Sequence, residues 1–399
     1  MRVTRVTFES PSIVLPAGTE AVTGTLTVAP AREEAVELPA RAVLYFDETV
    51  SMDIVTCRPV ALPVPKGHEG YFEALFTVER PRQDPVQIEA RFYLGDYDAD
   101  KAALLVKARE AAARLRAQLD DPNAGEDALR NARRLLTQAR MAEEWLAWEF
   151  DEQAGIHLEV FTTIRPAIEA LARGEDFQSI NPGSLPVLLD LPGDMSMPAI
   201  VFWVSLPENY NEGGPWPVTI HLHGSGGRRS WLPAPSHPHE GALHNYKHGV
   251  PMPYISITPT TNARWDPDVL DLMLDHVLDV YHADVDRVSL TGFSMGGGGT
   301  YAWATERPER FAALAVLAGA PRDSDLARIA HIPIWICHGE KDMTVRVELG
   351  REAGAELERL GTRVRYTFHP ELGHGIQAQH QRTEEFWAWL ASFRRTMPE

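Results

Sequence analysis

The residues best suited to chemistry surround Ser294, in the stretch LTGFSMGGGGTY over residues 290–301. Gly292, Ser294 and Gly296 match the pattern G-x-S-x-G, with a strand-like apolar segment before it and a segment rich in Ala and Gly after it. In a strand-turn-helix setting this pattern is typical of a nucleophile elbow, a tight turn that exposes the serine hydroxyl. A phosphate-binding loop is excluded, because no Lys-Ser or Lys-Thr pair follows the glycines.

A serine hydroxyl needs a base to attack a carbonyl, and the base needs an acid that orients it. The chain offers both after Ser294, each one following a predicted strand: Asp342 in IPIWICHGEKDMTV and His374 in FHPELGHGI. We predict that Asp342 is the acid and His374 the base. The alternatives are Glu340 for the acid and His369 or His338 for the base.

The same chemistry needs hydrogen-bond donors for the oxyanion that develops on the attacked carbonyl. The backbone N–H of Met295, the residue after the serine, is the first candidate. The loop HLHGSGG at 221–227 follows an early strand, and its glycines let the backbone approach a substrate. We predict that Gly224 and Ser225 belong to this oxyanion hole, with the Ser225 N–H as the second donor.

Histidines crowd the middle of the chain, at His221, His223, His237, His239, His244 and His248. We predict no metal site, because alternating residues such as His221 and His223 point to opposite faces of a strand and the set lacks a spacing typical of zinc. The histidines of 228–250 and Trp231 are interpreted as lining a substrate pocket. Trp265 is interpreted as a pocket wall or, the favoured interpretation, as a packing residue. No cofactor is implied.

The elements that must position these residues alternate between strands and helices from 198 onward. Apolar, strand-like segments are found at 198–207, 217–224, 253–259, 286–292, 311–320, 332–339 and 364–370. Amphipathic, helix-like segments are found at 266–284, 346–361 and 383–396. This alternation predicts an α/β fold with a mostly parallel sheet covered on both faces.

The first part of the chain has a different pattern. Residues 1 to about 96 alternate apolar and polar side chains in about five or six short segments, typical of a small antiparallel sandwich of immunoglobulin-like type. Residues 98–152 are rich in Ala, Leu, Arg and Glu at helical spacing and are interrupted by DPNAGED, which predicts a helical hairpin. We expect the hairpin on the catalytic domain or in a subunit contact. A further helix is predicted at 163–173, followed by the linker-like stretch SINPGSLPVLLDLPGD.

The length, net charge and cysteine number of the chain disfavour several classes of protein. A chain of 399 residues suggests two domains. Acidic residues outnumber basic ones by 56 to 38, for a formal net charge of -18, which disfavours nucleic acid as a partner. With two cysteines, a disulfide framework is not expected. No segment has the length and apolarity of a membrane span or a signal peptide, so we expect a cytoplasmic protein by default, or a secreted one if a signal peptide has been removed.

Five segments of the second half together resemble one family: HLHGSGG, DVDRVSLTGFSMGGGGTYAWA, ERPERFAALAVLAG, PIWICHGEKDMTV and ELGHG. They are similar to those of α/β-hydrolases, and in particular of serine carboxylesterases related to dienelactone hydrolase and to polyhydroxybutyrate-depolymerase-like esterases. The resemblance implies a triad of Ser294, Asp342 and His374, and an oxyanion hole at Met295 and the loop 224–225. Some of these esterases carry an N-terminal immunoglobulin-like domain. The hairpin departs from the family pattern.

The expected organisation is an immunoglobulin-like β domain at 1–97, a helical hairpin with a connecting helix at 98–180, and an α/β-hydrolase catalytic domain at 181–399. The expected activity is hydrolysis of small or oligomeric carboxylic esters through an acyl-enzyme intermediate. A serine peptidase of the same fold is the first alternative, and a binding or assembly protein with a vestigial site is the second. A homo-oligomer would form through the β domain or the hairpin.

Overall fold

The computed structural model describes residues 3–10, 12–30, 37–45, 49–80, 83–147, 154–177, 184–225, 253–261, 263–381 and 383–395. The chain divides into two compact units. The first comprises Met1–Val106 with Leu146–Arg165, and the second comprises Lys107–Trp145 with Pro166–Glu399. The chain passes between the units at three points, and all three fall within helices, so the domain limits expected from the sequence at residues 97 and 180 stay predictions.

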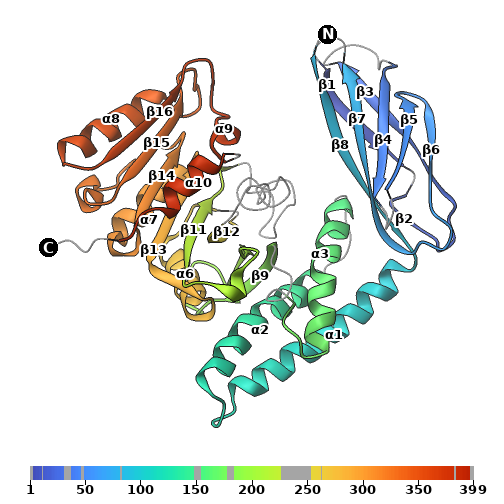
Figure 1. The fold of residues 1–399 in the computed structure, drawn as a ribbon, viewed down its shortest axis with the longest axis horizontal. Coiled ribbons are helices and arrows are strands. Elements are labelled where there is room, and N and C mark those ends of the chain that lie inside the picture. Colours follow the sequence, from blue (N-terminus) through green and yellow to red (C-terminus); the bar gives the residue numbers. More distant parts are fainter. Residues whose placement is uncertain are drawn as a thin grey trace. The chain divides into compact units, whose positions relative to one another are not determined.

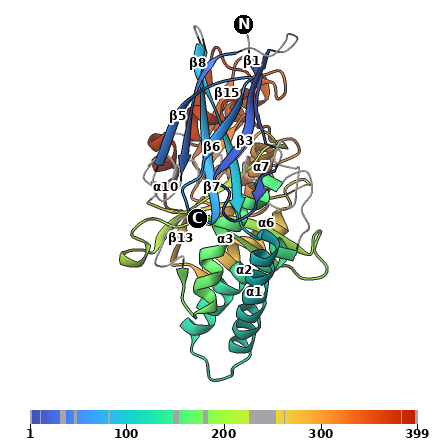
Figure 2. The same cartoon turned by 90° about the vertical axis from the view of Figure 1, so that its right-hand side faces the viewer.

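The first unit contains two sheets (Figure 2). The strands of the smaller sheet, in spatial order, are β1 (Val3–Glu9), β3 (Ala21–Pro30) and β6 (Pro59–Pro63). The strands of the larger sheet are β2 (Val14–Leu15), β8 (Gln83–Leu94), β7 (Gly70–Arg80), β4 (Pro39–Tyr45) and β5 (Thr49–Val55). All pairs are antiparallel except β2 with β8.

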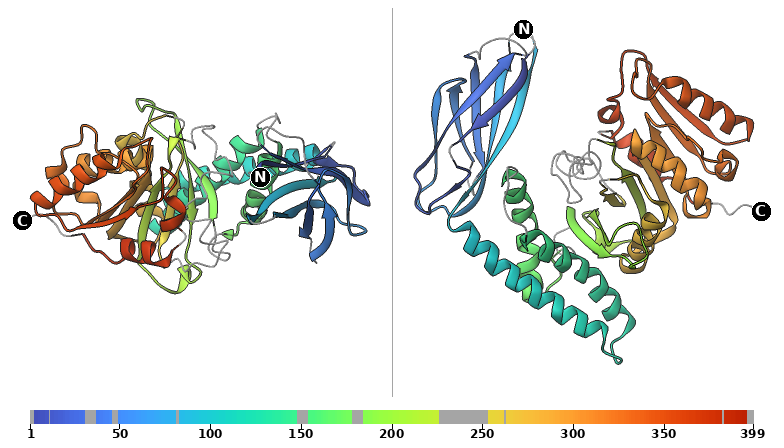
Figure 3. Two further views of the ribbon diagram at one scale, coloured as in Figure 1. Left: turned by 90° about the horizontal axis from the view of Figure 1, so that it is seen from above. Right: turned by 180° about the vertical axis from the view of Figure 1, so that it is seen from behind.

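The two sheets share one apolar core. Leu26 of β3 and Phe72 and Phe76 of β7 are buried in it, and the ring of Phe8 stacks on Phe76 at a centroid distance of 4.6 Å. The right-hand view of Figure 3 shows the two layers. The expected β sandwich is therefore present, although the strand number was underestimated. The sequence pattern missed β5 because most of its side chains are exposed or half-buried. The immunoglobulin-like topology stays a prediction.

Two long helices follow, α1 (Tyr97–Leu119) and α2 (Glu126–Ala147), with the predicted break between them. The part of this hairpin in the second unit is held there by ion pairs. Arg133 lies 2.7 Å from Asp279, and Arg140 lies 3.0 Å from Asp190. This part of the hairpin therefore lies on the α/β unit, which is one of the two expected locations. The predicted third helix is longer than expected and runs as α3 (Ala154–Ala172).

The second unit is built on an eight-stranded sheet (Figure 1). Its strands, in spatial order, are β16 (Val364–His369), β15 (Ile334–Gly339), β14 (Ala313–Leu317), β13 (Ala283–Phe293), β11 (Trp216–Leu222), β12 (Ile255–Pro259), β10 (Ala199–Ser205) and β9 (Ser184–Asp190). The strands from β16 to β12 are parallel, whereas β10 and β9 are antiparallel. The linker interpretation of the stretch at β9 was wrong, because its apolar side chains are buried and it pairs with β10 along its full length.

Helices cover both faces of the sheet. Val316 of β14 joins the core formed with α6 (Pro267–Val280), α7 (Met295–Glu306) and α8 (Val347–Arg359). Its neighbour Leu317 faces the other way and packs with α10 (Glu384–Ala391), which follows the short helix α9 (Gln377–Gln381). The predicted α/β fold class is therefore confirmed, with a β unit before it. Of the helices that the structure describes, none combines the length and apolarity needed to span a bilayer.

Candidate active site

Ser294 lies at the turn between β13 and α7, with φ 55° and ψ -113°. The neighbouring glycines make this turn feasible. A Cβ on Gly292 would lie 2.2 Å from the carbonyl oxygen of Gly296, and a Cβ on Gly296 would lie 2.0 Å from that of Leu222. The Ser294 N–H donates to the Leu317 carbonyl oxygen over 2.8 Å, which ties the turn to the end of β14. The predicted strand-turn-helix geometry is present at this serine.

The structure brings the three side chains predicted as a triad into one hydrogen-bonded line. His374 Nε2 lies 2.8 Å from Ser294 Oγ, and His374 Nδ1 lies 2.7 Å from Asp342 Oδ2. An ionised carboxylate can only accept, so Nδ1 carries the imidazole proton and Nε2 accepts from the serine hydroxyl. The arrangement can therefore remove the serine proton and hold the resulting imidazolium against a carboxylate.

Asp342 is 5% exposed and follows β15. Its Oδ1 accepts hydrogen bonds from the N–H groups of Thr344 at 2.8 Å and Val345 at 3.0 Å. Burial alone would raise the pKa of this carboxyl, but the hydrogen bonds from His374 and from the two backbone N–H groups outweigh it and lower the pKa below its ordinary value. The Asp342 side chain is therefore an ionised carboxylate at neutral pH.

The alternative acid and bases have other partners. Glu340 forms an ion pair with Arg351. His369 Nε2 lies 2.9 Å from Nε2 of His380. His338 is fully buried, and its Nε2 lies 2.7 Å from the Val345 carbonyl oxygen. None of these three candidates reaches Ser294 with a hydrogen bond in the described part of the chain.

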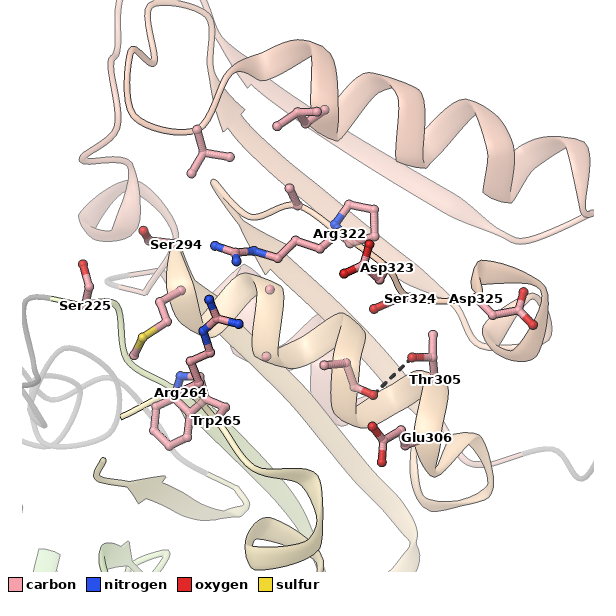
Figure 4. Close-up of a pocket in the computed structure, with 18 of the residues that line it drawn as sticks. Ser225, Arg264, Trp265, Ser294, Thr305, Glu306, Arg322, Asp323, Ser324 and Asp325 are labelled. Carbon is pink, nitrogen blue, oxygen red and sulfur yellow. Dashed lines mark hydrogen bonds between the residues drawn. The ribbon is translucent and has the colours of Figure 1, made fainter. Parts of the chain in front are cut away.

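Both predicted oxyanion donors border the cavity that contains Ser294 (Figure 4). Ser225 follows β11, and Met295 opens α7. Gly224 is buried, and a Cβ there would lie 2.9 Å from Cδ1 of Phe293. The loop after β11 thus passes close to the serine turn. Gly226 and Gly227 lie outside the described residues. The roles of Gly224, Ser225 and Met295 remain predictions.

The sequence pattern assigned no role to His223. In the structure, its side chain forms hydrogen bonds that stabilise the loop that carries Ser225. His223 Nδ1–H donates to the Gly224 carbonyl oxygen over 2.7 Å, and Nε2 accepts from the Thr261 N–H over 3.2 Å. Trp265 Nε1–H donates to the His223 carbonyl oxygen over 3.2 Å. Trp265 is 8% exposed, in agreement with a packing residue, and it also borders the cavity, where its role as a wall of the substrate pocket stays a prediction.

His221 points away from His223, as the strand alternation predicted. Gln381 Nε2 lies within 3.0 Å and 3.2 Å of the two His221 ring nitrogens, and burial lowers the pKa of His221 to about 3. Among the residues that the structure describes, no three His, Cys, Asp or Glu side chains are grouped to hold a metal ion. Trp231 and His237, His239, His244 and His248 lie outside the described residues.

The cavity has a volume of about 840 Å³ and follows α7 from Ser294 to Glu306. Loops at the carboxyl ends of three parallel strands form its walls: Arg264 and Trp265 after β12, residues 320–325 after β14, and Thr344 and Val345 after β15. Ligands of open α/β sheets bind at this edge. The cavity is therefore placed as a substrate pocket of the serine would be.

This sheet order, with the serine turn between β13 and α7, is that of an α/β-hydrolase. Residues 257–396 match the family model described as the dienelactone hydrolase family. Among curated proteins, the chain is similar to feruloyl esterase D of Neurospora crassa, with 28% identity over 163 residues, or 38% of this chain. The match spans 56% of that relative's length.

Solved structures with a similar fold include a thermostable esterase, at 15% identity and a TM-score of 0.47, covering 96% of this chain and 99% of that one. A ferulic acid esterase from Anaeromyces mucronatus, solved with ferulic acid, has 15% identity and a TM-score of 0.40, covering 53% of this chain and 90% of that one. The chain is similar in sequence to esterases over part of its length, and its own sheet order and serine turn are those of the α/β-hydrolase fold class.

Proposed function

We propose that the protein is a serine carboxylester hydrolase. The observation that carries the proposal is the line from Ser294 Oγ through His374 to Asp342, with distances of 2.8 Å and 2.7 Å. This line opens into a cavity large enough for a small ester. The family match over residues 257–396 and the similarity to a feruloyl esterase support ester hydrolysis.

In the proposed reaction, Ser294 Oγ bonds to the ester carbonyl carbon as His374 Nε2 takes its proton. The carbonyl oxygen becomes an oxyanion, to which the N–H groups of Met295 and Ser225 donate. Collapse of this intermediate breaks the ester C–O bond, and the alcohol leaves with the proton from His374. Water then attacks the acyl carbon as it gives a proton to His374. The bond between the acyl carbon and Ser294 Oγ breaks as Oγ takes that proton from His374, which releases the acid and restores Ser294.

The test is hydrolysis of para-nitrophenyl acetate and butyrate by the full chain, compared with hydrolysis of a peptide para-nitroanilide. Ser294→Ala removes the nucleophile, so we expect kcat for the esters to fall by about a thousandfold or more. Ser392→Ala is the matched control, because Ser392 is an exposed serine whose hydroxyl bonds to the Trp389 carbonyl oxygen. Ester turnover that is unchanged in Ser294→Ala contradicts the proposal. Faster cleavage of the anilide than of the esters indicates a peptidase instead.

A further inference from the structure

The loop that carries His374 is closed at its two ends by a pair of histidines outside the triad. This loop comprises residues 370–376, between β16 and α9 (Figure 1). His369 is the last residue of β16, and His380 lies in α9. Their Nε2 atoms are 2.9 Å apart. Side chains from before and after the loop therefore meet at one point.

Two ring nitrogens at this distance form a hydrogen bond only if one carries a proton and the other has a lone pair. Burial lowers the pKa of His380 to about 4, and the nearby His369 and Arg365 act in the same direction. Glu385 acts in the opposite direction and is outweighed. The His380 ring is therefore neutral at neutral pH and has one N–H and one lone pair, so either end of the pair can donate to the other.

His380 is also fixed from its other side. The residue is 4% exposed, and its Nδ1 lies 3.7 Å from Cys337 Sγ of β15. Burial raises the pKa of the Cys337 thiol, so Sγ keeps its proton. The rings of Trp335 and Phe386 pack on the imidazole, with centroid distances of 5.6 Å and 5.7 Å. His380 therefore has a fixed position, to which the half-buried His369 is bonded.

Backbone hydrogen bonds attach the first half of the loop to the segment that carries the proposed catalytic acid. The Glu340 N–H donates to the His369 carbonyl oxygen over 3.0 Å. The Lys341 N–H donates to the Leu372 carbonyl oxygen over 2.9 Å. Both bonds lie before His374 in the chain. The position of the second half of the loop therefore depends on α9.

Helix α9 has five residues, and helices this short need tertiary contacts to be stable. Ile376, just before the helix, is fully buried. Gln381, the last residue of the helix, lies 3.0 Å from a ring nitrogen of His221 in β11. The contact of α9 with the end of β16 is the hydrogen bond between His380 and His369. This bond joins the end of the loop to its beginning.

His374 requires the loop to stay in one position. Its ring forms hydrogen bonds of 2.8 Å with Ser294 and 2.7 Å with Asp342, and its centroid lies 4.8 Å from that of Phe293. A general base acts only within hydrogen-bond reach of the proton that it takes. A displacement of about 1 Å can lower a rate by about a hundredfold. Movement of either end of the loop would therefore reduce catalysis.

We propose that His369 and His380 are positioning residues for the base, because their hydrogen bond closes the loop 370–376 and keeps His374 Nε2 aligned with Ser294 Oγ. The inference rests on the proposed function. His369 and His380 are not among the described residues that border the cavity, so they act through His374 on the chemical step. Loss of the bond should therefore lower kcat and leave KM nearly unchanged.

The experiment measures kcat and KM for para-nitrophenyl acetate with the full chain. His369→Phe keeps an aromatic ring but removes the nitrogen that bonds to His380. We expect kcat to fall about fivefold or more and KM to change by less than about twofold. His369→Gln places an amide, which can donate or accept, near the position of Nε2, and it should recover most of kcat.

Thr367→Val is the matched control for a general loosening of β16. Thr367 is half-buried on the same strand, two residues before His369, and its hydroxyl accepts a hydrogen bond from Trp335 Nε1 over 3.0 Å. Removing this bond should lower the urea midpoint of unfolding and leave kcat at the wild-type value. Circular dichroism shows that each variant is folded before its kinetics are compared.

A double-mutant cycle tests whether the two histidines act as one contact. We expect His380→Phe to lower kcat by a factor similar to that of His369→Phe. The double variant His369→Phe/His380→Phe should lower kcat no further than the more affected single variant, because the bond is already lost in each. If His380→Phe does not fold, the two His369 variants and Thr367→Val decide by themselves.

Four outcomes overturn the inference while the proposed function stands. They are wild-type kcat in His369→Phe, no recovery in His369→Gln, an equal loss of kcat in Thr367→Val, and losses in the double variant that multiply. If the wild-type protein does not hydrolyse para-nitrophenyl acetate, or if Ser294→Ala keeps the wild-type turnover, the proposed function itself fails, and the inference fails with it.

Discussion

His338 Nε2 lies 3.2 Å from Asp342 Oδ2, the same oxygen that accepts the hydrogen bond from His374 Nδ1. His338 Nε2 carries its proton, since it also lies 2.7 Å from the Val345 carbonyl oxygen, which can only accept. This buried imidazole therefore holds both the carboxylate and the loop that surrounds it. The two residues are four positions apart in HGEKD, and this spacing is the signal from which the contact could have been expected.

Replacing His338 should reduce activity through Asp342. His338→Phe removes the donor to Val345 and Asp342, and we expect kcat to fall about tenfold with a loss of about 1–3 kcal/mol in the free energy of unfolding. His338→Gln can place a side-chain N–H near the position of Nε2 and should recover part of kcat. Steady-state kinetics on a para-nitrophenyl ester, with urea unfolding of each variant, measure both effects. Equal kcat in the wild type and His338→Phe would show that Asp342 does not depend on this contact.

The glycines after the serine turn should differ in their tolerance of a side chain. A Cβ would lie 2.8 Å from Gly319 Cα at Gly297 and 2.7 Å from Trp265 Cδ1 at Gly299, but 3.5 Å from the Ala320 carbonyl oxygen at Gly298. We expect Gly297→Ala and Gly299→Ala to lower the free energy of unfolding by about 1–3 kcal/mol through overpacking. Gly298→Ala should leave it unchanged or raise it by up to about 1 kcal/mol, because alanine favours the helix.

Thermal or urea unfolding measures the free energy of unfolding of the three glycine variants and so checks which of them are destabilised. A stabilised Gly299→Ala variant would contradict the contact with Trp265.

Trp265 should act on catalysis through the loop that carries Ser225. Trp265→Phe keeps an aromatic ring beside Gly299 but removes the N–H that donates to the His223 carbonyl oxygen. We expect kcat to fall several-fold while KM changes little, because a looser loop weakens the oxyanion donor more than it weakens substrate binding. Trp389→Phe, at a tryptophan on α10 that is distant in sequence from this loop, serves as the control for losing an indole. A Trp265→Phe variant that changes only KM would place this residue in substrate binding instead.

Stability should depend on pH through His221. Burial lowers the pKa of His221 to about 3 in the folded state, whereas the unfolded chain has a pKa of about 6.5. Between these values the unfolded state binds the proton and the folded state does not. The free energy of unfolding therefore falls as the pH falls through this window, by up to about 1.4 kcal/mol per pH unit.

His221→Gln removes this contribution, so its free energy of unfolding should change less steeply between pH 7 and pH 4. Part of the slope should remain, because burial also lowers the pKa values of His276 and His380 to about 4. Urea unfolding at several pH values measures the slope. The control is His282→Gln, at an exposed histidine, which should keep the wild-type slope. An unchanged slope in His221→Gln would show that this histidine does not contribute.

The sequence alone was enough to indicate the serine turn and the order of the reactive residues. The turn is local: Gly292 and Gly296 are close to Ser294 in the chain, and the strand before and the helix after it are visible as apolar periodicity. Asp342 and His374 follow strands of a parallel sheet, and the carboxyl ends of such strands meet at one edge. Their proximity to Ser294 could therefore be expected before any distance was known.

Other features depend on which segments meet, and only the tertiary structure decided them. Strand β9 contains Pro186, and it becomes a strand because β10 supplies its hydrogen-bond partners. Arg264 and Arg322 reach the same cavity because β12 and β14 lie on opposite sides of β11 and β13 in the sheet. Strand order is set by long-range packing, which periodicity in a sequence does not encode. The serine turn was thus determined locally, and the surroundings that would select its substrate were determined by the fold.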